Sequence, residues 1–260
     1  MRERDDVLRT VVADRRQNIQ GDHKRTRVVL KAALEELRPR ETDLQSISWF
    51  GRRWAANPVW CPRTADRLRE LADKIDRSGM GDELTIRRCD VFDCREDPVD
   101  VFLAAMAWGF GTTGYGWSRT ARMINPGLRN EEVTVAAAVE SYRSAWAEGG
   151  AEAVAQSWGR GTGRIPGLGP AFASKVAYFA LYDRDEQSGP LIADLNTAWS
   201  VWALSGIWDS RYDSAKYAEY VEWCVRWADE LSCRSDGIER ALFGIGPRVR
   251  AMYRQMNQKL

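Results

Sequence analysis

The amino-acid sequence predicts an all-α protein of about ten helices, arranged in one or two lobes. Apolar residues recur at intervals of three and four along most of the chain, which is the period of a helix with one buried face. Several of these stretches begin with a capping residue or an early proline, as helices do. Only Leu84–Ile86 and Cys89–Phe92 resemble strands, and both are short.

Four helices are predicted most clearly from their apolar stripes and their boundaries. They run through Leu68–Ile75, Val99–Trp108, 130–148 and Tyr217–Leu231. The second follows Asp97 and Pro98, which supply a cap and a first-turn proline. The third opens at Asn130 and is stopped by the pair Gly149-Gly150.

Composition excludes several classes of site. The 260 residues are 44% apolar and 29% charged, which suits one globular domain. A single histidine, His23, argues against histidine triads and histidine metal sites. The five cysteines have no CxxC spacing, so we expect no zinc, no iron–sulfur cluster, no disulfide framework and a reducing cytoplasm. We therefore expect no metal and no cofactor.

Two features argue against a membrane protein. The longest uncharged apolar stretch, Val101–Phe110, is too short to span a bilayer. The N-terminal residues carry charges of both signs and no apolar core, so they do not form a secretory signal.

Positive charge is local rather than global, since the formal net charge is only +1. Three windows, 117–130, 158–175 and 244–260, contain basic residues and no acidic ones. Together they could line one track for an anionic polymer such as DNA. They could equally be separate solvated faces that happen to lack acids.

The stretch Gly109–Gly114 reads GFGTTG, a formal dinucleotide-binding motif. That motif requires a preceding strand, whereas the segment before it predicts a helix. We therefore expect a glycine-aromatic loop between two helices. The loop is either a flexible connection, or it places Tyr115 or Trp117 in a nucleic-acid stack with Arg119 and Arg122 on phosphates.

Residues 165–199 carry the clearest functional pattern. A turn rich in glycine and proline precedes an apolar helix that contains Lys175. A polar loop and an apolar run, Pro190–Ala193, lead to Asp194, where a second helix begins. Lys175 and Asp194 are 19 residues apart.

This stretch resembles the helix-hairpin-helix DNA glycosylases, specifically the 8-oxoguanine glycosylase group. Their signature is a Pro-Gly-hydrophobic-Gly hairpin, a lysine that starts the next helix, and an aspartate 19 residues later after a Pro-Val-like run. The resemblance implies one helical glycosylase-like domain over residues 1–260, with two lobes around a cleft. Its helix-hairpin-helix would span about residues 160–185.

The hairpin itself allows two alignments. If Lys175 keeps its place, the hairpin is Pro170–Ser174, with alanine where the family has glycine. Shifting the alignment by four residues gives a better hairpin, Ile165–Gly169, but puts Ala171 at the nucleophile position. We prefer the first alignment, because the spacing between two catalytic groups is harder to meet by chance than a glycine-rich turn.

The resemblance also implies roles for single residues. Lys175 would be the nucleophile, and Asp194 would stabilise positive charge on the sugar. DNA contacts would come from Gly169, Ala171, Ala173, Asn196, Arg119, Arg122, Tyr115 and Trp117, and the base pocket from Phe179, Trp108 and Arg248. Each has a plainer alternative: Lys175 a surface lysine, Asp194 a helix cap, Asn196 a first-turn residue and Phe179 a core residue.

The function that this implies is excision of a modified base from double-stranded DNA, without a membrane or a protein partner. The base would be a bulky phage base, such as glucosylated hydroxymethylcytosine, removed in antiphage defence. The alternatives are an 8-oxoguanine repair glycosylase with AP-lyase activity, a non-catalytic helix-hairpin-helix protein, and a nicotinamide enzyme that uses the 109–114 loop.

Overall fold

A computed structural model describes residues 2–17, 22–37, 42–76, 83–124, 132–207 and 213–258. Within these residues the regular structure is helical apart from one short pair of strands, which confirms the predicted all-α class. The helices are α1 (Arg2–Arg16), α2 (His23–Leu37), α3 (Gly51–Ala55), α4 (Pro62–Ile75), α5 (Arg88–Phe92), α6 (Pro98–Phe110), α7 (Gly116–Ile124), α8 (Glu132–Arg160), α9 (Pro170–Leu181), α10 (Leu195–Ser205), α11 (Ser214–Leu231) and α12 (Ser235–Asn257). Strands β1 (Ser46–Trp49) and β2 (Leu84–Arg87) form an antiparallel pair.

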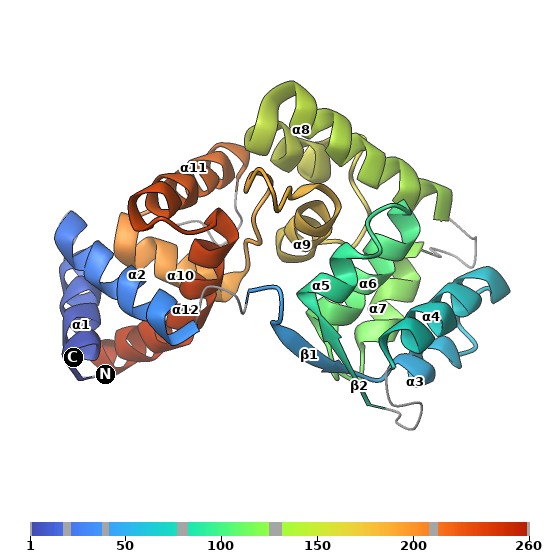
Figure 1. Ribbon diagram of the computed structural model, residues 1–260, viewed down its shortest axis with the longest axis horizontal. Helices are drawn as coiled ribbons and strands as arrows, with labels where there is room; N and C mark the ends of the chain where they lie inside the picture. Colours follow the sequence, from blue (N-terminus) through green and yellow to red (C-terminus); the bar gives the residue numbers. More distant parts are fainter. Residues whose placement is uncertain are drawn as a thin grey trace.

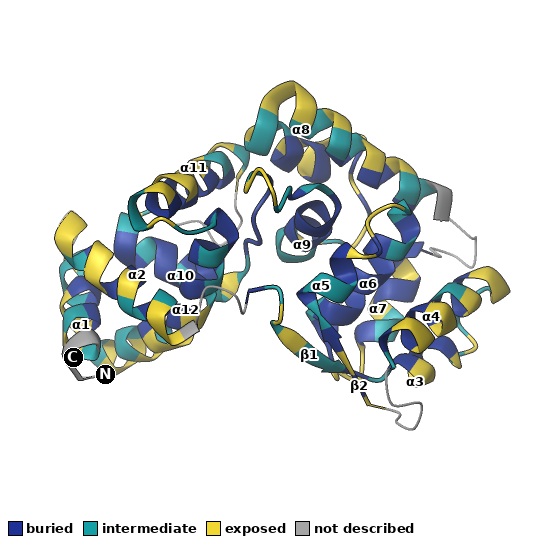
Figure 2. Cartoon of the chain, viewed as in Figure 1, coloured by how far each residue is buried: buried dark blue, intermediate teal, exposed yellow. Residues whose placement is uncertain are grey.

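The helices form two lobes that meet at α9 (Figure 1). One lobe contains α1, α2, α10, α11 and α12, and the other contains the two strands and α3 to α7. Helix α9 packs against α6 and α8, and α8 in turn packs against α11. Residues 173–180 of α9 are all buried, as Figure 2 shows for this central helix. A side chain on α9 is therefore held at the junction of the lobes.

Helix α10 is fixed by an unusually close approach of α12. A Cβ added at Gly246 of α12 would lie 2.1 Å from the carbonyl oxygen of Asn196. Only glycine allows the two backbones to come so close. Ser200 of α10 also donates a hydrogen bond to the carbonyl oxygen of Leu242. The first turn of α10 is thereby set against α12.

Three of the four clearest predicted helices are confirmed, since their apolar stretches lie within α4, α6 and α11. Helix α6 begins at Pro98, and the Asp97 carboxylate accepts hydrogen bonds from the backbone N–H groups of Val99 and Asp100 at 2.8 and 3.1 Å. The predicted stripe on α11 is buried, with Tyr217 and Tyr220 fully enclosed. Among the described residues, no helix has both the length and the apolar character needed to cross a membrane.

Two secondary-structure predictions need correction. Cys89–Phe92 is part of helix α5, not a strand, and β1 was not predicted. Helix α5 starts directly after β2 because the Asp90 carboxylate accepts the backbone N–H of Arg87 at 2.8 Å and turns the chain. An apolar run this short does not distinguish strand from helix.

The predicted stop at Gly149-Gly150 is a kink rather than an end. Gly150 has φ +62°, a left-handed conformation that favours glycine, and helical structure resumes after it up to Arg160. The start predicted at Asn130 lies outside the described residues, as do Arg129 and Lys259 of the basic windows.

Candidate active site

The hairpin before α9 matches the second alignment rather than the preferred one. Gly169 is the N-cap of α9, and Gly167 adopts φ +84° in the turn before it. Pro170–Ser174 forms the first turn and a half of α9. The prediction that these residues form the hairpin is therefore wrong. Four residues make about one helical turn, so Lys175 lies on the same side of α9 as Ala171 and one turn further from the hairpin.

Lys175 and Asp194 meet at the junction of the lobes. Lys175 Nζ lies 3.5 Å from Asp194 Oδ2, and the two side chains are 9% and 16% exposed. The other carboxylate oxygen, Oδ1, accepts hydrogen bonds from the backbone N–H groups of Asn196 and Thr197 at 3.0 and 3.1 Å. Asp194 is therefore a helix cap and also faces the amine, because each role uses a different oxygen.

The amine of Lys175 is enclosed by α9 and α6. It donates a hydrogen bond to the carbonyl oxygen of Ala171 at 3.3 Å and lies 5.5 Å from the ring centre of Phe172. A Cβ added at Gly109 would lie 2.5 Å from Phe172 and 3.2 Å from Lys175. Gly109 thus lets α6 approach α9. Because helix α6 precedes it, the GFGTTG stretch lacks the strand that a dinucleotide site requires.

The chain just before Asp194 is held by side-chain hydroxyl groups. Residues 190–193 are buried and form neither helix nor strand, so their peptide groups need other partners. The Tyr217 hydroxyl bonds both the N–H and the C=O of Leu191, at 3.0 and 2.8 Å. The Tyr220 hydroxyl donates to the carbonyl oxygen of Ile192 at 2.9 Å. These two contacts tie the segment to α11.

The third hydroxyl comes from Ser174, which directly precedes Lys175. Its Oγ accepts a hydrogen bond from the N–H of Ala193 at 3.0 Å. Ala193 directly precedes Asp194, so this one bond links the neighbours of both site residues. Ser174 is fully buried. Its hydroxyl therefore helps to set the distance between the amine and the carboxylate.

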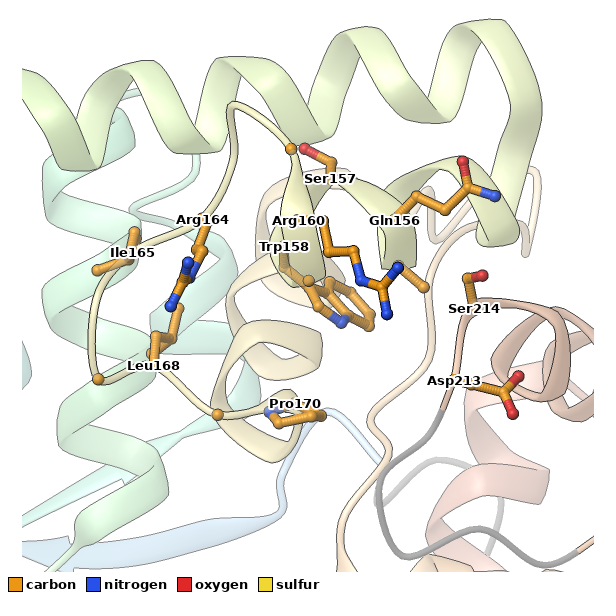
Figure 3. A pocket seen from close by; sticks show the side chains of 15 residues that line it. Gln156, Ser157, Trp158, Arg160, Arg164, Ile165, Leu168, Pro170, Asp213 and Ser214 are labelled. Carbon is orange, nitrogen blue, oxygen red and sulfur yellow. The ribbon is translucent and has the colours of Figure 1, made fainter.

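Asp194 opens into a cavity of about 220 Å³ that continues in two directions. Through Gly167, Gly169 and Pro170 it adjoins a cavity of about 1030 Å³, where Figure 3 shows Arg164 beside the hairpin and Arg160 next to Trp158. Through Leu195 it adjoins a third cavity of about 650 Å³.

Each of the three cavities carries arginine. The small one is lined by Arg119, the large one by Arg160 and Arg164, and the third by Arg250 and Arg254. The acidic residues in these linings are Asp194 and Asp213. The structure thus brings residues from all three acid-free windows to adjoining cavities around Asp194. We call this surface the arginine track.

Three of the eight residues expected to contact DNA line this track, and four others are at least partly exposed. Gly169 and Ala171 line the small cavity with Arg119. Arg122 is exposed on α7, Tyr115 is 55% exposed, and Trp117 is partly buried. The exception is Ala173, which is completely buried and offers no side-chain surface to DNA. Asn196 is half-buried in the first turn of α10.

The residues expected in a base pocket line none of the three cavities. Phe179 is fully buried and packs edge-to-face against Trp108, with ring centres 5.4 Å apart. The indole N–H of Trp108 donates to the carbonyl oxygen of Gln45 at 3.3 Å. Arg248 lies beside Asp5 and Glu36, at 3.9 and 3.8 Å. Phe179 and Trp108 therefore pack as core residues, and Arg248 belongs to the contact between α12 and the N-terminal helices.

Sequence reasoning missed a buried polar network one turn along α9 from Lys175. Arg88 of α5 pairs with Glu239 of α12 at 2.8 Å and donates to the Tyr178 hydroxyl at 3.1 Å. Tyr178 in turn donates to Asp236 at 2.8 Å. Burial raises the pKa of Glu239 to about 7; the Arg88 guanidinium opposes this rise, and the charge of Asp194 adds to it. The network joins both lobes to the helix that carries Lys175.

Nothing in the sequence signals this network, because residues 88, 178, 236 and 239 are far apart in the chain and each has an ordinary local setting. The described residues contain no group of three or more His, Cys, Asp or Glu side chains that could hold a metal ion.

Comparison with known families identifies the lineage. The model of a family described as "Putative 8-oxoguanine DNA glycosylase OGG-like protein" matches residues 40–243, which include the hairpin, Lys175 and Asp194. The chain belongs to this family. The match confirms the resemblance seen around residues 165–199. Searches of curated proteins and of solved structures give no match.

Membership of the OGG-like family gives the two lobes and the arginine track a functional setting. The family is described by its likeness to a DNA glycosylase, so membership points to glycosylase activity and to DNA as the partner. The matched region begins after α1 and α2 and ends within α12. Lys175, Asp194 and the network of Arg88 lie inside it, whereas Arg250 and Arg254 of the arginine track lie beyond it.

Proposed function

We propose that this OGG-like protein excises a modified base from DNA, with Lys175 as the nucleophile and Asp194 as its electrostatic partner. The observation that carries the proposal is the 3.5 Å contact between Nζ and Oδ2, at a cavity open to an arginine track. A carboxylate stabilises the positive charge that builds on the sugar as the base leaves, and an amine beside it can attack the same carbon as the nucleophile.

The proposed reaction begins when the Lys175 ammonium gives a proton to solvent water, which leaves a neutral amine beside the Asp194 carboxylate. Nζ then attacks C1′ of the sugar, and the new C–N bond forms as the bond to the base breaks. The electron pair of the broken bond leaves with the base, which takes up a proton. Asp194 stabilises the positive charge that develops on the sugar. Ring opening gives an iminium, from which loss of a C2′ proton would release the 3′ phosphate.

The DNA backbone would lie along the arginine track. Backbone N–H groups at a helix start and arginine side chains bind phosphate without reading the sequence. A modified base would leave the stack to bring its sugar to Asp194. Binding should therefore weaken steeply with salt.

For the substrate, we propose a bulky modified base of phage DNA rather than 8-oxoguanine. Two features that depart from the repair-enzyme pattern support this: the glycine-aromatic loop after α6, and the extra turn between the hairpin and Lys175. The test is to incubate the protein with host DNA, DNA containing 8-oxoguanine and phage DNA with glucosylated hydroxymethylcytosine. Released bases are then identified by mass spectrometry. Release of 8-oxoguanine alone overturns the substrate proposal. Release of no base from any of the three DNAs overturns the proposal that the protein is a DNA glycosylase.

Asp194→Asn separates the carboxylate's charge from its capping role. Asparagine also caps helices well, so α10 should keep its start. We expect the single-turnover rate of base release to fall by about 10²–10³-fold, because a preorganised charge is lost. The affinity for DNA should stay the same. An unchanged rate would show that Asp194 only caps the helix.

Ser174→Ala tests how the pair is positioned. Loss of the bond to Ala193 should let Asp194 shift relative to Lys175, and misplacement of about 1 Å can cost up to about 10²-fold in rate. We expect kcat to fall with little change in KM. Ser205→Ala, which removes a hydroxyl bonded within α10 to Val201, is the control. Equal kcat values in the two variants would remove Ser174 from the positioning of the site.

A further inference from the structure

The third cavity, at the α10 and α12 end of the arginine track, combines aromatic and basic side chains. It is lined by Leu195, Trp199, Arg250, Tyr253, Arg254, Asn257 and Gln258. We call this set the α10–α12 shelf. Its volume of about 650 Å³ exceeds that of the cavity beside Asp194, so it has room for a group of its own.

The two aromatic side chains of the shelf, Trp199 and Tyr253, pack against each other and against a third ring. The ring centres of Trp199 and Tyr253 are 5.1 Å apart, with the planes tilted by 49°. The ring of Trp202 meets both, at 5.7 Å from Trp199 and 5.3 Å from Tyr253. Three rings that pack against one another lose little freedom when a flat ligand stacks on them. The shelf is thus a preorganised surface for a planar group.

The polar part of the shelf selects for negative charge. Arg250 and Arg254 lie one helical turn apart on α12, and the lining contains no acidic residue. Asn257 and Gln258 add amide groups, which both donate and accept hydrogen bonds. Aromatic faces, arginines and amides together suit a nucleotide, whose base stacks and whose phosphate pairs with arginine.

The shelf is continuous with the candidate active site. Leu195 lines both cavities, follows Asp194 directly in the chain and is 48% exposed. A strand whose sugar lies at Asp194 would therefore pass Leu195 to reach the shelf. Bases inside a duplex present no free face, so stacking there requires an unpaired nucleotide.

We propose that the α10–α12 shelf binds an unpaired nucleotide that neighbours the one under attack. Its base stacks on Trp199 and Tyr253, and its phosphate lies on Arg250 and Arg254. This inference rests on the proposed function for its orientation, but it makes a separate prediction. The protein should bind unmodified single-stranded DNA through the shelf, without any base being released.

The test measures the affinity for a short unmodified oligothymidylate by fluorescence anisotropy. Trp199→Leu should weaken binding by at least about fivefold, because stacking contributes about 1–3 kcal/mol per base. Trp146→Leu is the matched control, since Trp146 lies half-buried on α8 and lines none of the three cavities. Circular dichroism checks that both variants fold.

A second variant changes an exposed residue of the shelf, so that its effect on binding does not depend on packing in the core. Arg254 is exposed, so Arg254→Gln should leave folding intact while reducing the slope of log Kd against log salt by about 0.7. Arg226→Gln, an exposed position on α11, should leave the slope unchanged. If both shelf variants bind like their controls, the shelf proposal is overturned. Absence of base release from any DNA would overturn the proposed function instead, and leaves the oligothymidylate result standing.

Discussion

Replacing Lys175 by glutamine is expected to abolish base release, with a loss of at least about 10³-fold in the single-turnover rate. Glutamine is close to lysine in length and keeps a donor for the Ala171 carbonyl oxygen, but it has no amine to attack C1′. The α9 packing around position 175 should therefore survive. The affinity for DNA, measured by anisotropy on the same substrate, should change little, because the Lys175 side chain is only 9% exposed and the arginines of the track are all retained.

Lys31→Gln provides the control for this result. Lys31 is exposed on α2 and far from α9 in the chain, so its loss removes one positive charge without touching the pair. Its rate should equal that of the unaltered protein. Full activity in Lys175→Gln would exclude attack by this amine and would leave Asp194 to act by charge stabilisation with water as the nucleophile.

Arg88→Leu is expected to have the largest effect on stability, with a loss of about 3–5 kcal/mol in the free energy of unfolding. Arg88 is 1% exposed, and its guanidinium pairs with the equally buried Glu239. It also lies 5.3 and 5.1 Å from the ring centres of Trp108 and Tyr178. Leucine leaves the Glu239 carboxylate in the interior without its partner. Urea denaturation followed by circular dichroism measures the loss.

Two further variants separate the buried pair from an ordinary ion pair. Arg88→Leu combined with Glu239→Leu removes the stranded charge, so it should recover part of the lost stability. Arg69→Leu breaks an exposed pair with Asp66 on α4 and should cost less than about 1 kcal/mol. A cost for Arg88→Leu no larger than that of Arg69→Leu would show that the network does not hold the lobes together.

Local patterns in the sequence predicted much of the fold, because they reflect forces that act between near neighbours. The cap at Asp97 and the stripe on α11 depend on residues within a few turns, and both are found as expected. The prediction of a strand at Cys89–Phe92 was wrong because its structure also depends on contacts with residues that are distant in sequence. Besides the local cap by Asp90, the first turn of α5 has its Arg88 and Cys89 N–H groups bonded to the carbonyl oxygens of Gln45 and Asp43, which are distant in sequence.

In the candidate site, too, features that depend on nearby residues could be predicted and those that depend on distant contacts could not. The resemblance to the helix-hairpin-helix glycosylases, with its 19-residue spacing, paired Lys175 with Asp194, and the carboxylate's role as a cap was visible from its place before α10. The hairpin alignment was wrong because an added helical turn preserves a side chain's direction while shifting the sequence by four residues. The hydroxyl contacts of Tyr217 and Ser174 join segments that no local pattern connects.

The most direct test is the site of the covalent intermediate. The protein is incubated with duplex DNA that carries its modified base, reduced with borohydride, digested and sequenced by tandem mass spectrometry. The chain has six lysines, so the assignment is unambiguous. We predict a deoxyribose remnant on Lys175. A remnant on another lysine, or base release with no trapped protein, would contradict the assignment of Lys175 as the nucleophile.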